Sequence, residues 1–499
     1  MNWHTVLLSI LIFKRGICYN KCKPNIAIVG GGIGGAATSH FLTEIFNNNL
    51  DIDLYEAKTI GGRLATVKID NNEFEAGGSI IHPRNKYMQD FVQLLGLQHR
   101  PSKNQRTSIW NGNEIVFEES NWEILSLVKL IYRYGIQPFS LNRHVISVIN
   151  DFEKIYHLQN NGEAFVNISN LLLSVNTGFS KLLKKSIKNE LLDLGYSEKL
   201  IDELVKTTLV VNYGQDTNIH SFVGFVSLAG AGSNLWSVKG GNKKVPEHLI
   251  YRNKYVNVIS SQVMKIVYIP HDDSPDVYEV HSCAQNSTVI MKEAYDIVIL
   301  AIPLFSNQEF PIIFEGFPNN DFYNSAEYHE TIATFVKADL KSHYFGLEEE
   351  LDNILSCNPN KTIISSLGRL NSVEGSMKSS NIWKIFSNKP LKSNIINEMF
   401  LNTYFVIFAQ TVIYLVQEKK QITWKAYPEY ITRIPEAKFK LHDTLYHVNA
   451  IELIASAMEM SAIGAKNVAL LAYKDFSAKF CFERIIQRNL STKKLSIEL

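Results

Sequence analysis

The chain has 499 residues, of which 45% are hydrophobic, and this is enough to build two or three packed domains. Its glycine, proline and cysteine contents are ordinary, which excludes fibrous, disordered and disulfide-built proteins. Fifty basic residues balance forty-nine acidic ones, so the net charge of +1 indicates neither nucleic acid nor an anionic membrane as a partner. A small or apolar ligand is the better expectation.

Residues 1–20 are typical of a secretory signal peptide. Residues 5–13 form an apolar core that is too short to span a bilayer comfortably. Only His4 could carry a positive charge before this core, and Lys14-Arg15 stands where a cleavage region is usually small and neutral. We expect cleavage between Gly16 and Asn20, and an N-terminal strand or helix is the alternative.

Four Asn-x-Ser/Thr acceptor sites fit passage through the secretory pathway as a glycoprotein: Asn167, Asn286, Asn360 and Asn489. The five cysteines are too few and too scattered for a disulfide framework, although one bridge is possible. No paired Cys/His spacing suggests zinc, so we expect no metal.

The first structured segment predicts a strand, a helix and a second strand. Residues 25–29 are a short apolar run that ends in glycines, as in a buried parallel strand that turns sharply into a helix. The second run, residues 52–55, ends at Glu56. This unit has the length of a Rossmann-type repeat.

The organisation then becomes less regular. Residues 95–234 are predicted to be mainly helical, with Ser197 as an N-cap. Strand patterns return at residues 256–259, 263–267 and 295–303, and a helix rich in small residues is predicted from Ile451 to Leu471. We therefore expect an α/β fold with an α+β substrate region. Its nucleotide-binding domain is discontinuous (25–94, 235–305 and 440–475), and the substrate domain is inserted as 95–234 and 306–439.

One apolar stretch stands apart from this scheme. Residues 399–417 are interrupted only by Asn402, Thr403, Gln410 and Thr411. Three interpretations remain open: a buried strand or helix, a membrane-associated segment, or an insertion foreign to the fold.

The glycine motif Gly30-x-Gly32-x-x-Gly35 lies between the first predicted strand and helix. Its first glycine permits a tight turn, the second lets backbone approach a pyrophosphate, and the third allows close helix packing. The helix N-terminus then faces the negative charge. Glu56 follows Gly35 by 21 residues, close to the spacing at which an acid accepts from ribose hydroxyls. The motif predicts a dinucleotide site, for NAD or FAD.

A second motif selects between these cofactors. Gly61-Gly62-Arg63 follows the acidic residue, and the segment 75–78 ends in Gly77-Gly78. An arginine here can pair with phosphate oxygens in two places. The pattern resembles the FAD-containing amine oxidase superfamily, in which such an arginine contacts the pyrophosphate and the flavin edge. The resemblance implies FAD, and an amine-oxidase-like fold.

Three further segments fit the same superfamily. Residues 239–242 resemble the Gly-Gly segment that precedes a helix leading back into the flavin domain. The resemblance places Val263 on the strand that offers backbone groups to the adenine. Residues 449–452 resemble the final flavin segment, with Glu452 as a cofactor contact or, equally, a helix cap.

Longer strings narrow the resemblance to the prenylcysteine oxidase family, over roughly residues 25–475. They are residues 88–97, residues 227–231 with 234–242, and residues 466–473. None of them serves a general dinucleotide-binding purpose. The sequence departs from the family pattern where Tyr404–Val416 looks longer, as a genuine insertion would, and where Lys239 replaces an expected acid.

The family resemblance implies oxidation of farnesylcysteine or geranylgeranylcysteine during breakdown of prenylated proteins. The products would be a prenyl aldehyde, free cysteine and, from oxygen, hydrogen peroxide. Flavin performs the electron chemistry and the protein supplies orientation and a dry apolar pocket. A base need only activate water, and His82 is our candidate.

Two other functions remain open. A flavin amine or polyamine oxidase would share the fold, and a secreted binding protein could have kept it without turnover. The intact set of glycines with Glu56 and Arg63 argues against the second. The expected partners are a prenylcysteine and molecular oxygen, without nucleic acid but with possible peripheral association with lipid. The expected location is the secretory pathway, then the lysosome or the extracellular space.

Overall fold

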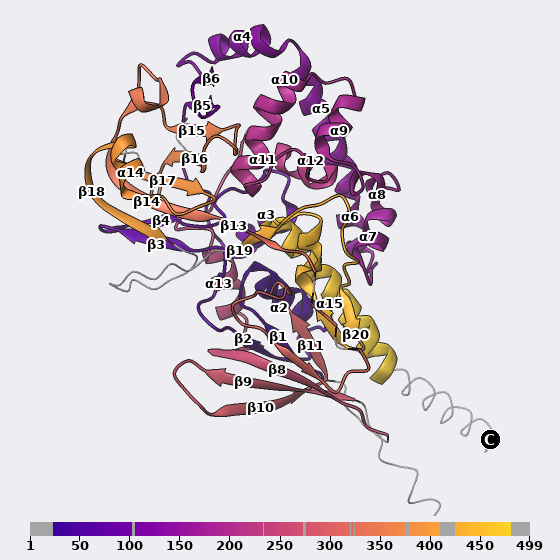
Figure 1. Ribbon diagram of the computed structural model, residues 1–499. Helices are drawn as coiled ribbons and strands as arrows, with labels where there is room; N and C mark the ends of the chain where they lie inside the picture. Colours follow the sequence, from indigo (N-terminus) through magenta and orange to yellow (C-terminus); the bar gives the residue numbers. More distant parts are fainter. Residues whose placement is uncertain are drawn as a thin grey trace, which may run out of the picture.

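The computed structural model describes residues 23–101, 105–232, 234–272, 276–319, 321–323, 325–375, 380–409 and 425–480. The predicted signal peptide, Asn489, Cys18, Cys22 and Cys481 lie outside these residues. Figure 1 shows a lower part built around a parallel sheet and an upper part that combines a larger sheet with a group of helices.

A six-stranded sheet forms the centre of the lower part, in the order β20-β21-β11-β1-β2-β7. Its strands are β1 (Asn25–Val29), β2 (Asp51–Tyr55), β7 (Val256–Ile259), β11 (Ile297–Leu300), β20 (Lys440–His442) and β21 (Leu445–His447). β1 pairs in parallel with β2 and β11, which confirms the expected strand, helix, strand unit. Ile26, Ile28 and all of β11 are buried, as continuous apolar strands require.

Different elements cover the two faces of this sheet. Helices α2 (Ile33–Ile45), α13 (Lys244–Tyr251) and α15 (Met458–Phe480) cover one face, where Ile26 and Ile28 point. The four-stranded sheet β10-β9-β8-β12 covers the other, where Ala27 and Val29 point. Its strands are β8 (Ser261–Ile269), β9 (Val277–Ala284), β10 (Ile290–Tyr295) and β12 (Ile313–Glu315). Successive side chains of β1 therefore pack alternately into two different hydrophobic cores.

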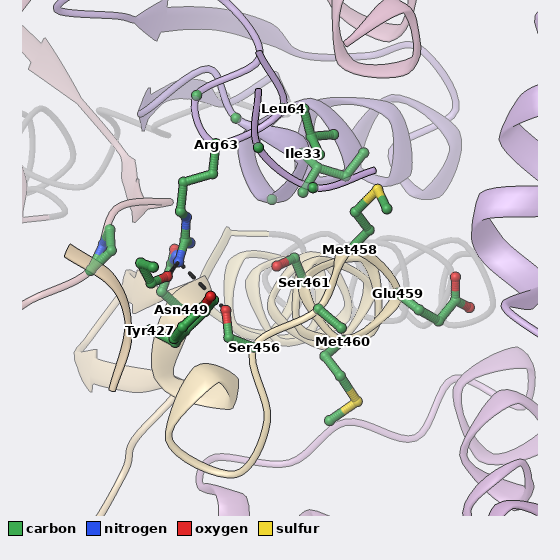
Figure 2. Close-up of a pocket in the computed structure, with 18 of the residues that line it drawn as sticks. Ile33, Arg63, Leu64, Tyr427, Asn449, Ser456, Met458, Glu459, Met460 and Ser461 are labelled. Atoms are coloured by element: carbon green, nitrogen blue, oxygen red, sulfur yellow. Dashed lines mark hydrogen bonds between the residues drawn. The ribbon is translucent and has the colours of Figure 1, made fainter. Parts of the chain in front are cut away.

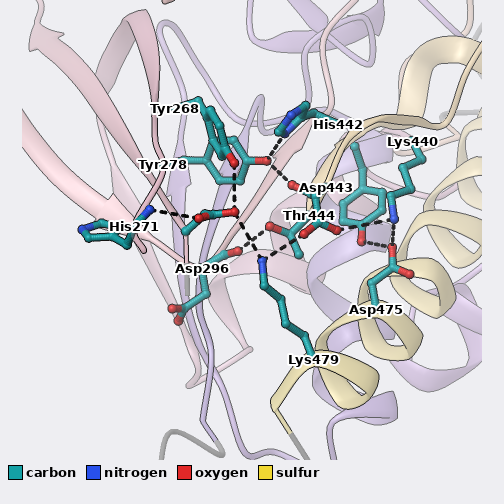
Figure 3. Close-up of polar contacts among 12 residues, drawn as sticks. Tyr268, His271, Tyr278, Asp296, Lys440, His442, Asp443, Thr444, Asp475 and Lys479 are labelled. Atoms are coloured by element: carbon teal, nitrogen blue, oxygen red, sulfur yellow. Dashed lines mark hydrogen bonds and ion pairs between the residues drawn. The ribbon is translucent and has the colours of Figure 1, made fainter. Parts of the chain in front are cut away.

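Polar contacts fix the far end of α15 against these strands (Figure 3). Lys479 bonds to Asp443 at 2.9 Å, and the Tyr278 hydroxyl contacts the Asp443 carbonyl. Lys440 reaches Asp475 of α15 at 2.8 Å. These pairs join β9, the β20–β21 hairpin and the helix.

A seven-stranded sheet dominates the upper part, in the order β18-β14-β17-β16-β15-β5-β6. Its strands are β5 (Thr107–Trp110), β6 (Ile115–Glu118), β14 (Ile332–Leu340), β15 (Asn353–Ser356), β16 (Ile364–Arg369), β17 (Ile382–Ser387) and β18 (Phe400–Ala409). Two antiparallel strand pairs accompany it: β3 (Thr66–Ile69) with β4 (Asn72–Glu75), and β13 (Tyr328–Glu330) with β19 (Lys425–Pro428). Short helices η2 (Ser342–Phe345) and α14 (Ser393–Met399) connect its strands.

The helical lobe occupies residues 123–229. It contains α4 (Glu123–Tyr134), α5 (Gln137–Phe152), α6 (Lys154–Asn160), α7 (Ile168–Val175), α8 (Phe179–Leu182), α9 (Ile187–Asp193), α10 (Glu198–Leu200), η1 (Ile201–Val205), α11 (Lys206–Tyr213) and α12 (Ser221–Ala229). Helix α3 (Lys86–Leu94) joins it to the lower part. Ser197 caps α10 by accepting the Leu200 amide, as predicted. The strands β5 and β6 are an addition to a region that was expected to be mainly helical.

One prediction requires correction, and one open interpretation is partly resolved. The helix expected from Ile451 begins only at Met458, because Val448–Leu453 forms a 3₁₀ turn (η3) whose Glu452 is held by tertiary contacts. Residues 400–409 form β18, an edge strand paired with β14. The rest of Tyr404–Val416 lies outside the described residues, so the insertion stays a prediction. Among the described helices, none is long and apolar enough to cross a membrane.

Candidate active site

A cavity of about 690 Å³ runs from the carboxyl ends of β1 and β2 into the helical lobe. Residues that the sequence singled out line its lower part: Gly30, Gly32, Glu56, Gly61, Gly62, Arg63, Gly78, His82 and Val263. Ligands of open parallel sheets bind at this edge of the strands. Gly35 and Glu452 lie behind the cavity wall and act on it through other groups.

The three motif glycines have different steric surroundings. A Cβ on Gly35 would lie 1.9 Å from the Gly30 carbonyl oxygen, so α2 packs directly on the turn. Gly30 has a φ of +106°, and a Cβ there would lie 2.7 Å from the Ala301 oxygen. By contrast, a Cβ on Gly32 would meet nothing nearer than the Gly61 oxygen at 3.9 Å. Space beside Gly32 is therefore open for a ligand, as a pyrophosphate-binding glycine requires.

Glu56 closes the ribose side of this turn. One carboxylate oxygen accepts the Gly31 amide and the other the Lys58 amide, both at 2.8 Å. Burial raises the pKa of Glu56 above its usual value, against the opposing effect of these amides. The carboxylate oxygens retain lone pairs for ribose hydroxyls. Val263, on β8, lines the same end of the cavity and is 4% exposed.

The Gly61-Gly62-Arg63 loop lies against the glycine turn. The Gly61 amide donates to the Gly31 carbonyl at 2.9 Å, and Gly61 and Gly62 have φ values of +113° and +56°. Backbone of this shape favours glycine at both positions. The loop thereby brings Arg63 to the cavity wall.

Arg63 is held by a buried carboxylate. Its guanidinium contacts both oxygens of Glu452 and donates to the Ala426 carbonyl at 2.8 Å. Burial alone would lower the pKa of Arg63, but Glu452 outweighs it and raises that pKa. Figure 2 shows Arg63 directed at the side of the site where Tyr427, Asn449 and Ser456 gather.

Glu452 is fully buried and its oxygens are shared among protein groups. The Asn449 amide donates to it at 2.7 Å and the Tyr328 hydroxyl at 3.1 Å, in addition to Arg63. Glu452 thus orients Arg63, and its direct contact with a cofactor stays a prediction. The Oδ1 atom of Asn449 is buried without a partner and Asn449 lines the cavity, so this atom is available to a bound donor.

Gly78 marks the position where a flavin ring would pass. Its amide donates to the Arg63 carbonyl at 3.1 Å, and its carbonyl accepts from the Asn242 side chain at 3.0 Å. Glu75, 2% exposed, accepts the Asn242 amide at 2.8 Å. The segments 75–78 and 239–242 are therefore bonded to each other.

His82 lines the cavity near its mouth. Burial lowers the pKa of His82, and the neighbouring Arg84 adds to this effect, so the ring is neutral at pH 7. Its Nδ1 accepts the Arg84 amide at 3.1 Å, which leaves the proton on Nε2. In this tautomer Nε2 donates a hydrogen bond and cannot accept a proton. His82 could act as a base only if the hydrogen bond between Nδ1 and the Arg84 amide opened. Water activation by His82 stays a prediction.

Arg84 forms an ion pair at the same mouth. Its Nε donates to Glu153 at 2.7 Å, and a second nitrogen contacts the other Glu153 oxygen. Both side chains line the cavity and remain about one third exposed. The sequence contained no signal for this pair, because Glu153 lies between α5 and α6 and Arg84 lies in a loop far earlier in the chain.

Glu459 is a further residue that the sequence did not reveal. It lies in the first turn of α15, and its carboxylate accepts the Tyr87 and Met88 amides at 2.8 and 3.0 Å and the Tyr156 hydroxyl at 2.7 Å. It thereby caps the N-terminus of α3 from another helix. Burial raises the pKa of Glu459 to about 7. In Figure 2 its carboxylate points away from Arg63.

The upper end of the cavity is apolar. Its wall consists of side chains from α5, α11, α12 and α15: Val148, Ile149, Phe152, Val211, Phe222, Phe225, Val226, Met460 and Ile463. Phe222 packs edge-on against Phe152, with ring centroids 5.5 Å apart. This end can hold an extended hydrocarbon chain and excludes water from it.

The acceptor asparagines that the structure describes lie away from the cavity. Asn286 and Asn360 are exposed, and Asn167 is partly buried because its side chain caps α7 at the Asn170 amide. Cys283 and Cys357 are free thiols. Attachment of sugar at these sites stays a prediction.

Comparison with known proteins agrees with this geometry. The family model described as "Prenylcysteine lyase" matches residues 117–482, and "NAD(P)-binding Rossmann-like domain" matches residues 28–95. "Prenylcysteine oxidase 1" of Pongo abelii is 38% identical over 90% of this chain and 88% of its own. "Prenylcysteine oxidase 1-like" of Bos taurus is 34% identical over 98% of both chains.

Solved structures with the same fold are far more distant in sequence. Putrescine oxidase bound to putrescine has a TM-score of 0.57 at 12% identity, covering 91% of this chain and 99% of its own. The CLA-producing fatty acid isomerase of P. acnes has a TM-score of 0.56 at 14% identity, covering 92% and 98%. These likenesses show the fold. The chain belongs to the prenylcysteine oxidase family of flavin-dependent oxidases.

Proposed function

We propose that this protein is an FAD-dependent thioether oxidase that cleaves farnesylcysteine or geranylgeranylcysteine. The observation that carries the proposal is one continuous cavity, with a dinucleotide-binding turn at one end and an apolar, aromatic wall at the other. The family and the names of its curated relatives support the same substrate. The reaction would convert the thioether, water and oxygen into a prenyl aldehyde, free cysteine and hydrogen peroxide.

The residues fit FAD at three points. The open space beside Gly32 accommodates a pyrophosphate, Glu56 offers acceptors to a ribose, and Asn449 offers an unused oxygen. When bound, FAD would accept the hydride from the carbon beside sulfur and return the electrons to oxygen. Arg63, oriented by Glu452, supplies a fixed positive charge next to this position.

The protein would orient the substrate and exclude water from its prenyl chain. The apolar wall around Phe152, Phe222 and Phe225 would hold the prenyl chain, so that its first carbon lies near Gly78. Water would reach the oxidised carbon from the mouth, where His82 and the Arg84–Glu153 pair stand. Addition of that water forms a hemithioacetal, which collapses to the aldehyde and the cysteine thiol.

An aerobic assay tests this proposal. Purified protein is mixed with farnesylcysteine, then with spermine or benzylamine, while hydrogen peroxide and the visible flavin absorbance are followed. We expect peroxide and a prenyl aldehyde only with the thioether. Turnover of the amine alone would establish an amine oxidase instead. A protein that cannot be reconstituted with FAD would support the binding-protein alternative.

We also propose passage through the secretory pathway, to the lysosome or out of the cell. The apolar N-terminal core and the exposed acceptors Asn286 and Asn360 support this route. Treatment of protein from eukaryotic cells with an endoglycosidase should increase its electrophoretic mobility. An unchanged mobility, with residues 1–20 still present, would contradict the route.

A further inference from the structure

Helix α4 exposes an apolar face to solvent. Six of its side chains are exposed: Ile124, Leu125, Leu127, Val128, Ile131 and Tyr132. Exposed fractions reach 76% at Ile124 and 92% at Tyr132. Figure 1 shows α4 at the outer edge of the upper part, far from the six-stranded sheet. Apolar side chains gathered in this way mark an interaction surface.

The helix is fixed in this orientation by contacts of its last turn. Positions three and four residues apart share one side of an α-helix, so the six residues form a single stripe, which we call the α4 face. At the border of this stripe Tyr134 is 6% exposed, and its hydroxyl donates to Glu203 at 2.8 Å. Arg133 contacts the same Glu203 at 2.6 Å. These contacts hold the last turn of α4 on the protein and leave the α4 face free.

Basic residues follow the start of α4, although Glu123, the first residue of the helix, is acidic and exposed, and Arg133 is paired with Glu203. Residues 124–150 contain no aspartate or glutamate, but they contain Lys129, Arg133 and Arg143. Trp122, 76% exposed, stands immediately before the helix. An apolar stripe with aromatic side chains and basic neighbours is typical of helices that lie in the headgroup layer of a membrane. The exposed Lys129 and Arg143 also complement anionic phospholipid.

The helix that follows connects this face to the cavity. α5 begins at Gln137, next to the exposed Ile136, and Val148, Ile149 and Phe152 near its end line the cavity. A 16-residue helix is about 24 Å long. A lipid surface at α4 would therefore lie one helix length from the cavity, and a prenyl thioether partitions into lipid. This last step rests on the proposed function, whereas the α4 face does not.

We propose that α4 docks this protein on phospholipid surfaces that contain anionic lipid. The α4 face lies among the headgroups, and the basic side chains at its edge meet the phosphates. The docked protein takes its apolar substrate from the lipid rather than from water.

Sedimentation with vesicles of phosphatidylcholine and phosphatidylserine tests the docking. The variant Ile124→Glu/Val128→Glu should bind these vesicles at least about a hundredfold more weakly, since two apolar side chains no longer enter the lipid and two carboxylates face its phosphates. The matched control Val289→Glu/Met291→Glu changes two similarly exposed apolar residues beside and on β10, which are 62% and 54% exposed. It should bind like the unchanged protein. Equal loss in both variants, or no binding by the unchanged protein, overturns the proposal.

A second measurement uses the fluorescence of Trp122 and needs no charged substitution. Brominated phospholipid should quench the fluorescence of Trp122 on binding. The conservative variant Trp122→Phe should keep vesicle binding and lose that quenching. Binding without any Trp122-dependent quenching would place the contact elsewhere and contradict the assignment to α4.

The same variants separate docking from catalysis and from self-association. Flavin content and turnover of a short, water-soluble prenylcysteine should not change in Ile124→Glu/Val128→Glu. Absence of turnover in the unchanged protein, with vesicle binding intact, would reject the proposed function and keep the docking. A dimer in light scattering that this variant dissolves, without vesicle binding, would make the partner a second copy and overturn the proposal.

Discussion

The two ends of the cavity are built in different ways. The lower end is made of backbone: three glycines, the Gly61–Gly62 loop and the amides that Glu56 accepts, all within residues 30–62. The upper end is made of side chains from α5, α11, α12 and α15, which are far apart in the chain. Steric and conformational limits therefore govern the cofactor end, and packing governs the substrate end. Substitutions at the two ends should fail in different ways.

The largest effect should come from Gly35→Ala. The added Cβ would stand 1.9 Å from the Gly30 oxygen, and backbone cannot move aside as a side chain can. We expect a loss of about 4 kcal/mol or more in the free energy of unfolding, measured by urea denaturation. The matched variant Gly32→Ala meets no protein atom within 3.9 Å, so it should keep its stability and lose only flavin affinity. Equal destabilisation of both variants would contradict this distinction.

A smaller effect is expected where a side-chain pair supports the cofactor end. Arg63→Met leaves the Glu452 carboxylate buried without its cation, at a cost of about 3–5 kcal/mol in unfolding free energy. The double variant Arg63→Met/Glu452→Gln should recover most of this stability but not flavin binding. A double-mutant cycle measures the coupling. Additive losses would show that the two residues act independently.

Glu459 predicts a pH dependence of stability. The folded protein keeps its proton to about pH 7, whereas the unfolded chain releases it near pH 4.5 because burial raises the folded pKa. Stability from this group is therefore lost as the pH rises from 4.5 to 7, by roughly 3 kcal/mol, and is constant above. Thermal unfolding against pH should show this fall, and Glu459→Gln should remove it. An identical slope in the variant would assign the effect to another group.

The smallest effect should arise at the substrate end. Val226→Thr places a hydroxyl in the apolar wall with almost no change of shape. We expect stability and the flavin spectrum to stay unchanged and the KM for farnesylcysteine to rise about tenfold, because the prenyl chain then meets an unpaired polar group. Val226→Ile is the apolar control. A change in flavin absorbance would show that the two ends are not separate.

The elements that form the cofactor end of the cavity were predictable from the sequence alone. β1, α2, β2, the glycine turn and Glu56 were predicted correctly as elements or positions because their pattern is local: each residue constrains neighbours within about one strand, helix, strand unit. Resemblance added the family, which the comparisons confirm.

The remaining features of the site could not be predicted from the sequence, because they depend on contacts between residues that are distant in the chain. Arg63 meets Glu452 across 389 positions, and that contact belongs to a 3₁₀ turn where a helix was expected. Glu459 caps α3, although 372 positions separate Glu459 from Tyr87 in the chain. The α4 face is identified by the exposure of its apolar side chains. Periodicity reports which side of a helix is apolar, but only packing decides whether that side is buried or exposed.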